Sequence, residues 1–281
     1  MAQVRDAARF CPGPHVNGGE RAGDGQHRLE VRGLTHEFAR ADQAPLRVLE
    51  GLDFAVRPGE FTAIIGPSGS GKSTLFNLVA GLDRPTSGVI YVDGRAVTGH
   101  SEQVAYMPQK DLLFPWRTIE DNAALGLEVQ GTAKRAARAA VRPLFPEFGL
   151  DGFERSYPAQ LSGGMRQRAA LLRTVAMQRS VLLLDEPFGA LDSLTRTQMQ
   201  LWLAQMWQRH SWTVLLVTHD IREAVFLADS VHVLTSRPGR LAARVVVDLP
   251  RPRTTQTFLQ PEFARLEQQV LSALGTTSDV P

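Results

Sequence analysis

Apolar and polar residues alternate in two early segments of the chain, residues 29–31 and 52–56. A strand with one buried face shows this period of two, because successive side chains point to opposite faces of a sheet. A further apolar run at residues 89–92 leads into the pair Asp93-Gly94, which is typical of a hairpin turn. These three segments therefore predict antiparallel strands.

Three other runs are largely apolar at every position, at residues 61–65, 181–184 and 213–217. Strands that are buried on both faces of a parallel sheet have this continuous pattern. Each run lies next to a segment with helical spacing of its apolar residues, such as residues 75–82. Alternation of strands and helices argues for a parallel sheet covered on both faces, so the predicted fold class is α/β.

The segment from about residue 115 to about 160 has no strand-like run and is rich in Ala and Arg. Thr118 followed by Asp121 has the spacing of a capping box at the start of a helix. Asp220 and Glu223 repeat this spacing later in the chain. We expect an inserted helical subdomain over about 115–160, beside the antiparallel β-subdomain.

The central domain is predicted to cover residues 28–250. Residues 1–27 are dense in Gly and Pro and lack the apolar stretch of a signal peptide, so we expect a disordered leader there. A strand is expected over 244–249, and residues 251–281 are expected to form a C-terminal linker and helix. One face of that helix carries the apolar residues Phe263, Leu266, Val270 and Leu274.

Composition and charge exclude several classes of protein. The 281 residues include 31 basic and 29 acidic side chains, a net charge of +2, so the chain lacks the basic excess of a dedicated nucleic-acid-binding protein. The single cysteine, Cys11, excludes an internal disulfide and a cysteine-based zinc site. No stretch of about 18 apolar residues occurs, so no segment is expected to span a bilayer.

A glycine-rich sequence after the run at 61–65 matches the phosphate-binding loop (P-loop) pattern G-x-x-x-x-G-K-[ST]. Its glycines let backbone N–H groups surround an anion, and the following helix directs its N-terminus at the same place. Lys72, one of only three lysines, can act on the β- and γ-phosphates as a catalytic cation, and Ser73 can bind Mg²⁺. A purely structural glycine turn is the alternative, which the flanking strand and helix disfavour. The predicted nucleotide-binding residues are Gly66, Pro67, Ser68, Gly69, Ser70, Gly71, Lys72, Ser73 and Thr74.

Two carboxylates, Asp185 and Glu186, follow the apolar run at 181–184. Because side chains alternate along a strand, the two point to different sides, and one can hold Mg²⁺ while the other addresses a water molecule. We therefore expect Asp185 to bind the metal and Glu186 to act as general base. Acidic residues also end strands at surfaces without any function, but their position after a P-loop favours the catalytic interpretation.

A second candidate anion site lies at Ser162-Gly163-Gly164. Ser162 is a natural N-cap for a helix that is predicted to run through Val175, and the glycines expose the first amides of that helix. One active site does not need two such helix starts. Two copies of the chain facing head to tail could pair each P-loop with the other copy's Ser-Gly-Gly, which predicts a homodimer.

The order of these motifs resembles the ATP-binding subunit of ATP-binding cassette (ABC) transporters, over roughly residues 29–248. The resemblance implies ATP with Mg²⁺, and it gives roles to four further residues. Gln109 is similar to the Q-loop glutamine, which senses Mg²⁺ and the attacking water and acts as a hinge. His219 is similar to the switch histidine at the γ-phosphate, and Asp192 to the D-loop aspartate that communicates across the dimer. Phe38 is the candidate for stacking on adenine, although an aromatic residue on a strand can also belong to the core.

Residues 106–119, 161–165 and 236–239 are similar to one subgroup of ABC importers, which take up nitrate, aliphatic sulfonates, taurine or hydroxymethylpyrimidine-type compounds. This implies a peripheral subunit on the cytoplasmic face of the inner membrane. Its partners would be transmembrane permease subunits and a solute-binding receptor, not nucleic acid. Residues 111–116 are expected either to line the groove for the permease's coupling helix or to pack the insert. Met165 departs from the usual glutamine, and we expect hydrolysis to survive because the phosphate contacts come from the preceding Ser-Gly-Gly.

Two alternatives belong to other classes: a soluble ABC ATPase of DNA repair or translation, and the cassette of an exporter. The first is disfavoured because such proteins usually carry paired cassettes or long coiled-coil insertions. The transported solute is not determined by this sequence, since the cassette never touches it.

Overall fold

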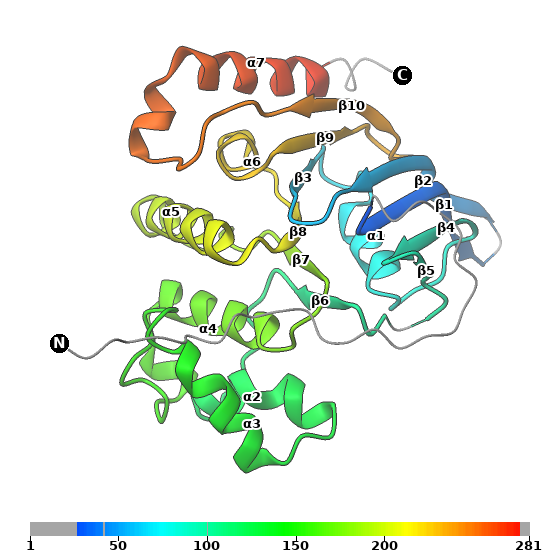
Figure 1. The fold of residues 1–281 in the computed structure, drawn as a ribbon. Helices are drawn as coiled ribbons and strands as arrows, with labels where there is room; N and C mark the ends of the chain where they lie inside the picture. Colours follow the sequence, from blue (N-terminus) through cyan, green and yellow to red (C-terminus); the bar gives the residue numbers. More distant parts are fainter. Residues whose placement is uncertain (1–26, 42, 100, 276–281) are drawn as a thin grey trace.

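The computed structural model describes residues 27–41, 43–99 and 101–275. Its centre is a six-stranded sheet in the order β10-β9-β3-β8-β7-β6 (Figure 1). Neighbouring strands are parallel except for β10, which pairs antiparallel with β9 at the edge. The strands are β3 (Phe61–Ile65), β6 (Val104–Met107), β7 (Val181–Asp185), β8 (Thr213–Val217), β9 (Ser230–Leu234) and β10 (Leu241–Val246).

The three continuous apolar runs are confirmed as β3, β7 and β8, which lie side by side in this sheet. Strands β6 and β9 were not predicted, because β6 has only four residues and β9 contains the polar Ser230 and His232. The strand expected at 244–249 is wrong in its bounds. Only residues up to Val246 pair with β9, while Val247 and Leu249 are buried in the core beyond the ladder.

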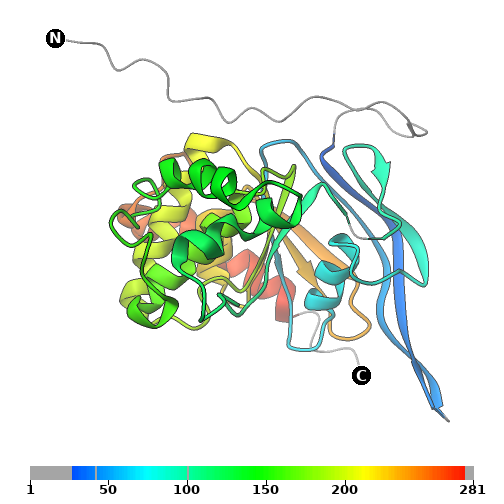
Figure 2. The same cartoon turned by 90° about the horizontal axis from the view of Figure 1, so that it is seen from below.

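The predicted antiparallel strands are confirmed as a second sheet in the order β2-β1-β4-β5. Its hairpin between β4 and β5 turns at Asp93 and Gly94, both with positive φ. This sheet lies opposite the inserted helices (Figure 2). The strands are β1 (Leu29–Arg40), β2 (Gln43–Val56), β4 (Ser87–Val92) and β5 (Arg95–Ala96).

The predicted helical insert contains α2 and α3, and helices α4 to α7 follow it. The capping box predicted at Thr118 and Asp121 is half formed. The Thr118 hydroxyl accepts a hydrogen bond from Asp121 N at 3.2 Å, but the Asp121 carboxylate accepts hydrogen bonds from Arg138. The helices are α1 (Lys72–Val79), α2 (Ile119–Val129), α3 (Lys134–Val141), α4 (Gly163–Val175), α5 (Ser193–His210), α6 (Ile221–Leu227) and α7 (Pro261–Gly275).

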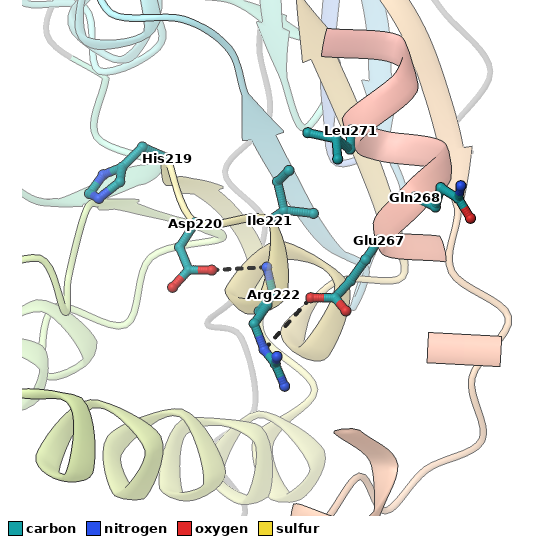
Figure 3. Close-up of a pocket in the computed structure, with 7 residues that line it drawn as sticks. All are labelled: His219, Asp220, Ile221, Arg222, Glu267, Gln268 and Leu271. Carbon is teal, nitrogen blue, oxygen red and sulfur yellow. Dashed lines mark hydrogen bonds and ion pairs between the residues drawn. The ribbon is translucent and has the colours of Figure 1, made fainter. Parts of the chain in front are cut away.

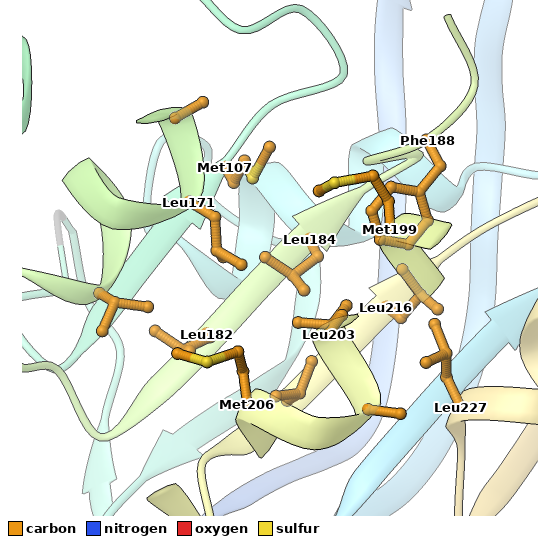
Figure 4. Packing of buried hydrophobic residues seen from close by; sticks show 14 of the residues in the cluster. Met107, Leu171, Leu182, Leu184, Phe188, Met199, Leu203, Met206, Leu216 and Leu227 are labelled. Atoms are coloured by element: carbon orange, nitrogen blue, oxygen red, sulfur yellow. The ribbon is translucent and has the colours of Figure 1, made fainter. Parts of the chain in front are cut away.

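The central sheet separates two hydrophobic clusters, because its strands direct alternate residues to opposite faces. Ala63 packs in the cluster with α2 to α7, whereas its neighbour Ile64 packs in the cluster with α1 and the antiparallel sheet. Figure 4 shows part of the first cluster, where Leu182 and Leu184 of β7 face Leu203 and Met206 of α5. Helices α1 and α4 therefore lie on opposite faces of the sheet.

Helix α7 packs its predicted apolar stripe onto the first cluster, with Phe263, Leu266 and Val270 buried. The chain before it is held by the buried guanidinium of Arg253, which donates hydrogen bonds to carbonyl groups at the end of α6, including Ala228 O at 2.7 Å. The predicted leader lies, apart from residue 27, outside the described residues.

Candidate active site

Residues 66–71 connect the end of β3 to the start of α1. Gly69 and Gly71 have φ values of 78° and 92°, which residues with a side chain rarely adopt. A Cβ on Gly71 would lie only 2.6 Å from Leu49 Cδ2 of β2. The loop can therefore turn tightly under β2 only because these positions are glycine, and the turn directs the N-terminus of α1 at its centre.

Lys72 folds its side chain back over the loop. Its Nζ donates hydrogen bonds to Gly66 O at 2.8 Å and Pro67 O at 2.9 Å. Burial lowers the pKa of this ammonium group, and the carboxylates of Asp185 and Glu186 act in the opposite direction. A positive charge thus lies inside the loop and close to both acidic residues.

Asp185 ends β7 as a buried carboxylate that accepts a hydrogen bond from the Tyr106 hydroxyl at 3.1 Å. Burial raises the pKa of the Asp185 carboxyl, and burial also raises the pKa of Tyr106. Ser73 lies exposed in the first turn of α1. Ser73 offers a hydroxyl, Asp185 a carboxylate and Gln109 an amide oxygen. These hard oxygen donors fit Mg²⁺, which takes few protein ligands and completes its shell with phosphate and water.

Glu186 follows β7 with an unusual φ of 44°, while its N–H donates to Val217 O of β8 at 2.8 Å. Its Oε2 accepts a hydrogen bond from Gln109 Nε2 at 2.9 Å and lies 3.3 Å from His219 Nδ1. The structure thus brings together three residues from separate segments, at the ends of β6, β7 and β8. A carboxylate held in this way is suited to accept a proton.

The Ser162-Gly163-Gly164 sequence starts α4, as predicted. Ser162 caps the helix by accepting a hydrogen bond from Met165 N at 3.3 Å, and the Met165 side chain packs against the core. Because α4 and α1 lie on opposite faces of the sheet, these amides do not share an anion site with the P-loop of the same chain. Asp192 has a local role as well, capping α5 through Thr195 N at 3.0 Å.

Phe38 lies on β1 with 42% of its surface exposed, so it is not a core residue. Its ring meets that of His36 edge to face at 4.7 Å. It pairs with Leu46 of β2, two residues before Val48, which contacts the P-loop at Gly71. The ring is thus partly exposed on the strand next to β2, which packs on the P-loop.

The capping box predicted at Asp220 and Glu223 is only half formed. Asp220 accepts hydrogen bonds from Arg222 N and Glu223 N, but its own N–H donates to the Thr218 hydroxyl at 3.0 Å. The Glu223 carboxylate is buried instead, with one oxygen lacking a hydrogen-bond partner. Burial, together with the negative charge of Asp220, raises the pKa of Glu223 to about 8.

Sequence reasoning missed two contacts at this site. Tyr106, inside the segment 106–119, donates to Asp185. Gly239, in the turn after β9, packs so closely on the P-loop that a Cβ there would lie 2.1 Å from Ser70 O. The only sequence signal for the second contact was the Arg-Pro-Gly stretch at 237–239.

A pocket of about 730 Å³ adjoins the site between the start of α6 and α7 (Figure 3). His219 and Asp220 line one end of it, and Leu271 of α7 lines another. Arg222 Nε of α6 forms an ion pair with Glu267 Oε1 of α7 at 3.6 Å. None of the P-loop residues lines this pocket, so the phosphate site is a separate feature.

The site combines a P-loop between β3 and α1, a buried aspartate at the end of β7 and a glutamate beside a histidine. Together with the antiparallel subdomain and the helical insert, these features define a P-loop ATPase. A sequence profile of the ABC transporter family matches residues 49–189. The chain therefore belongs to the ABC transporter family, and the predicted resemblance and fold class are confirmed.

Three curated relatives support this assignment. The nitrate import ATP-binding protein NrtD of Synechocystis sp. is 40% identical over 252 residues, covering 88% of this chain and 94% of the relative. The formylaminopyrimidine import ATP-binding protein ThiZ of Halalkalibacterium halodurans is 44% identical, covering 84% and 93%. The aliphatic sulfonates import ATP-binding protein SsuB of Bacillus licheniformis is 43% identical, covering 82% and 88%.

Among solved structures, a dimeric ATP-binding cassette in a post-hydrolysis state bound to ADP and phosphate superposes with a TM-score of 0.68. It is 26% identical in sequence, and the match covers 79% of this chain and all of that one. Within residues 27–275 of the present chain, with gaps at 42 and 100, no helix is long and apolar enough to cross a membrane.

Proposed function

We propose that this ABC family ATPase drives an import system by hydrolysing ATP with Glu186 as general base. This proposal rests on one observation. Gln109 Nε2 and His219 Nδ1 both lie within 3.3 Å of Glu186 Oε2, beside Lys72 of the P-loop. Glu186 would take a proton from the attacking water, while Gln109 orients that water and His219 contacts the γ-phosphate. The three relatives described above are named as import ATP-binding proteins, which supports import over export or DNA repair.

ATP is the proposed substrate of residues 66–74. Loop amides and the N-terminus of α1 would hold the phosphates, and the Lys72 ammonium would leave its own loop carbonyls to reach the β- and γ-phosphates. Phe38 would stack on adenine. The first assignment rests on the buried lysine inside the loop, and the second on the exposed Phe38 ring on the strand next to β2.

Ser73, Asp185 and Gln109 would hold Mg²⁺, which would neutralise phosphate charge when bound. Asp185 is suited to this role because it is buried near Lys72 and fixed by Tyr106, so that its carboxylate does not need to be ordered on binding.

A head-to-tail homodimer would complete each site with Ser162, Gly163 and Gly164 of the second copy, and Asp192 would lie at the interface. Two observations support this arrangement. One chain places its two anion-binding helix starts on opposite faces of its sheet, and the similar solved cassette is dimeric.

Permease subunits are the proposed membrane partners, with residues 111–116 as their docking segment. Leu112, Phe114 and Trp116 are exposed by 57%, 37% and 71%, and the last two rings stack at 5.1 Å. Only Leu113 packs into the core. The chain would lie at the cytoplasmic face of the membrane, with a solute-binding receptor in the complex and a small solute such as nitrate, a sulfonate, taurine or a pyrimidine precursor as cargo.

The substitution Glu186→Gln tests this proposal. Because general-base catalysis contributes about 10²- to 10⁴-fold, the ATP hydrolysis rate should fall by at least about 100-fold, while ATP binding remains and an ATP-dependent dimer accumulates. Glu262→Gln, at an exposed carboxylate in the first turn of α7, is the matched control and should behave like the parent. A Glu186→Gln protein that hydrolyses ATP at the parental rate would remove Glu186 from the base role.

A further inference from the structure

Two arginines of α4 fix the docking segment to the helix that starts with Ser162-Gly163-Gly164. The guanidinium of Arg173 donates two hydrogen bonds to consecutive carbonyl groups, Asp111 O at 2.6 Å and Leu112 O at 2.7 Å. Leu112 has a φ of 46°, which is rare for a residue with a side chain. The planar, forked guanidinium suits this pair of acceptors in a way that a lysine ammonium does not.

Arg166 makes the second connection. Its Nε lies 3.3 Å from Asp111 Oδ2, and its Nη1 donates a hydrogen bond to Leu161 O at 2.8 Å. Leu161 directly precedes Ser162, the N-cap of α4. A single side chain therefore joins the docking segment to the residue next to the anion-binding turn.

The other side of the docking segment is held by Asn122 of α2, which is fully buried. Its Oδ1 accepts from Phe114 N at 2.7 Å, and its Nδ2 donates to Phe114 O at 3.1 Å. Gln109, only two residues before Asp111, is bound to Glu186 on the ATPase core instead. The exposed Lys110 is thus the one residue between a segment held by the insert and a segment held by the core.

We infer that Arg166 and Arg173 are positioning residues, which transmit a displacement of residues 111–116 to Ser162, Gly163 and Gly164. Groups joined by hydrogen bonds on both sides move as one body, so contact at the docking segment would set the place of the anion-binding turn in the dimer. This inference rests on the proposed function, because it requires an ATP-driven dimer and a partner at the docking segment.

The test uses the purified protein with Glu186→Gln to hold ATP. Sedimentation measures dimer formation with ATP. Fluorescence measures the change in Trp116 emission when ATP is added, which we call the Trp116 response. A Trp116→Phe variant identifies this signal among the four tryptophans. Adding Arg166→Gln should weaken the dimer about five- to tenfold and abolish the Trp116 response. Binding of ATP by the monomer should stay unchanged, because Arg166 bonds to Asp111 and Leu161 and not to residues 66–74.

Asp111→Asn removes the other half of the Arg166 pair, and the double variant separates positioning from general destabilisation. If the two residues act as one unit, Asp111→Asn should weaken the dimer to a similar extent, and combining it with Arg166→Gln should cause no further loss. Arg173→Lys keeps the charge and should retain the fold but lose part of the Trp116 response. Arg135→Gln, at an exposed arginine of α3, is the control.

Normal dimerisation with a normal Trp116 response in Arg166→Gln would overturn the inference, as would additive losses in the double variant. Loss of dimerisation together with a parental Trp116 response would also overturn it. Failure of the Glu186→Gln parent to dimerise with ATP would instead refute the proposed dimer, and the inference with it.

Discussion

Gly239 lies outside the P-loop, but we expect its substitution by alanine to weaken nucleotide binding. The turn after β9 brings its backbone against the loop, where Gly239 N donates to Val48 O at 2.8 Å and Gly239 O accepts from Glu50 N at 3.0 Å. A Cβ there would lie 2.1 Å from Ser70 O and 3.2 Å from Leu49 Cδ2. The first of these atoms is backbone, so no side chain can rotate away to relieve the contact.

Gly239→Ala must therefore move either the turn or the P-loop. The clash is more than 1 Å inside ordinary van der Waals contact, which begins at 3.4 Å. A displacement of about 1 Å at a site that positions substrate can lower kcat/KM about 100-fold, and overpacking costs about 1–3 kcal/mol in the free energy of unfolding. We expect a rise in the KM for ATP and a fall in kcat/KM, measured by phosphate release, with a small fall in Tm.

Gly99→Ala is the matched control, because a Cβ at Gly99 would meet no atom within 4 Å. It should keep the parental KM and Tm. A folded Gly239→Ala protein with the parental KM and kcat/KM would refute the reasoning, since it would show that the β9–β10 turn does not set the geometry of the P-loop.

Two further substitutions test the surroundings of the site. Burial raises the pKa of Glu223 from 4.5 to about 8, so the native state keeps a proton that the unfolded chain releases, and the free energy of unfolding from this group falls as pH rises from about 4.5 to 8. The Tm of Glu223→Gln relative to the parent should therefore increase between pH 5 and 8, and a difference independent of pH would contradict the assignment. Phe38→Ala should raise the KM for ATP about fivefold or more, because stacking on a base is worth about 1–3 kcal/mol. Phe38→Trp should restore it, whereas an unchanged KM in the alanine variant would assign Phe38 to packing on β1 alone.

Much of the fold is predictable from short windows of this sequence. The continuous apolar runs gave β3, β7 and β8, and the capping residues Thr118 and Ser162 marked the starts of α2 and α4, because burial periodicity and capping depend on residues within a few positions of each other. Strand β9 could not be found in this way. Its buried His232 and Ser230 weaken the apolar pattern, and only its place between β3 and β10 makes it a strand.

The site also contains some features that neighbouring residues determine and others that only the tertiary structure determines. The P-loop pattern, the carboxylate pair at Asp185 and Glu186 and the N-cap at Ser162 are local, so their residue types and spacing were enough to predict them. The contact of Gln109 and His219 with Glu186, the close approach of Gly239 to Ser70, and the two arginines that hold Asp111 join residues far apart in the chain. They exist because the sheet order places the ends of β6, β7, β8 and β9 along one edge, and no short stretch of sequence encodes that order.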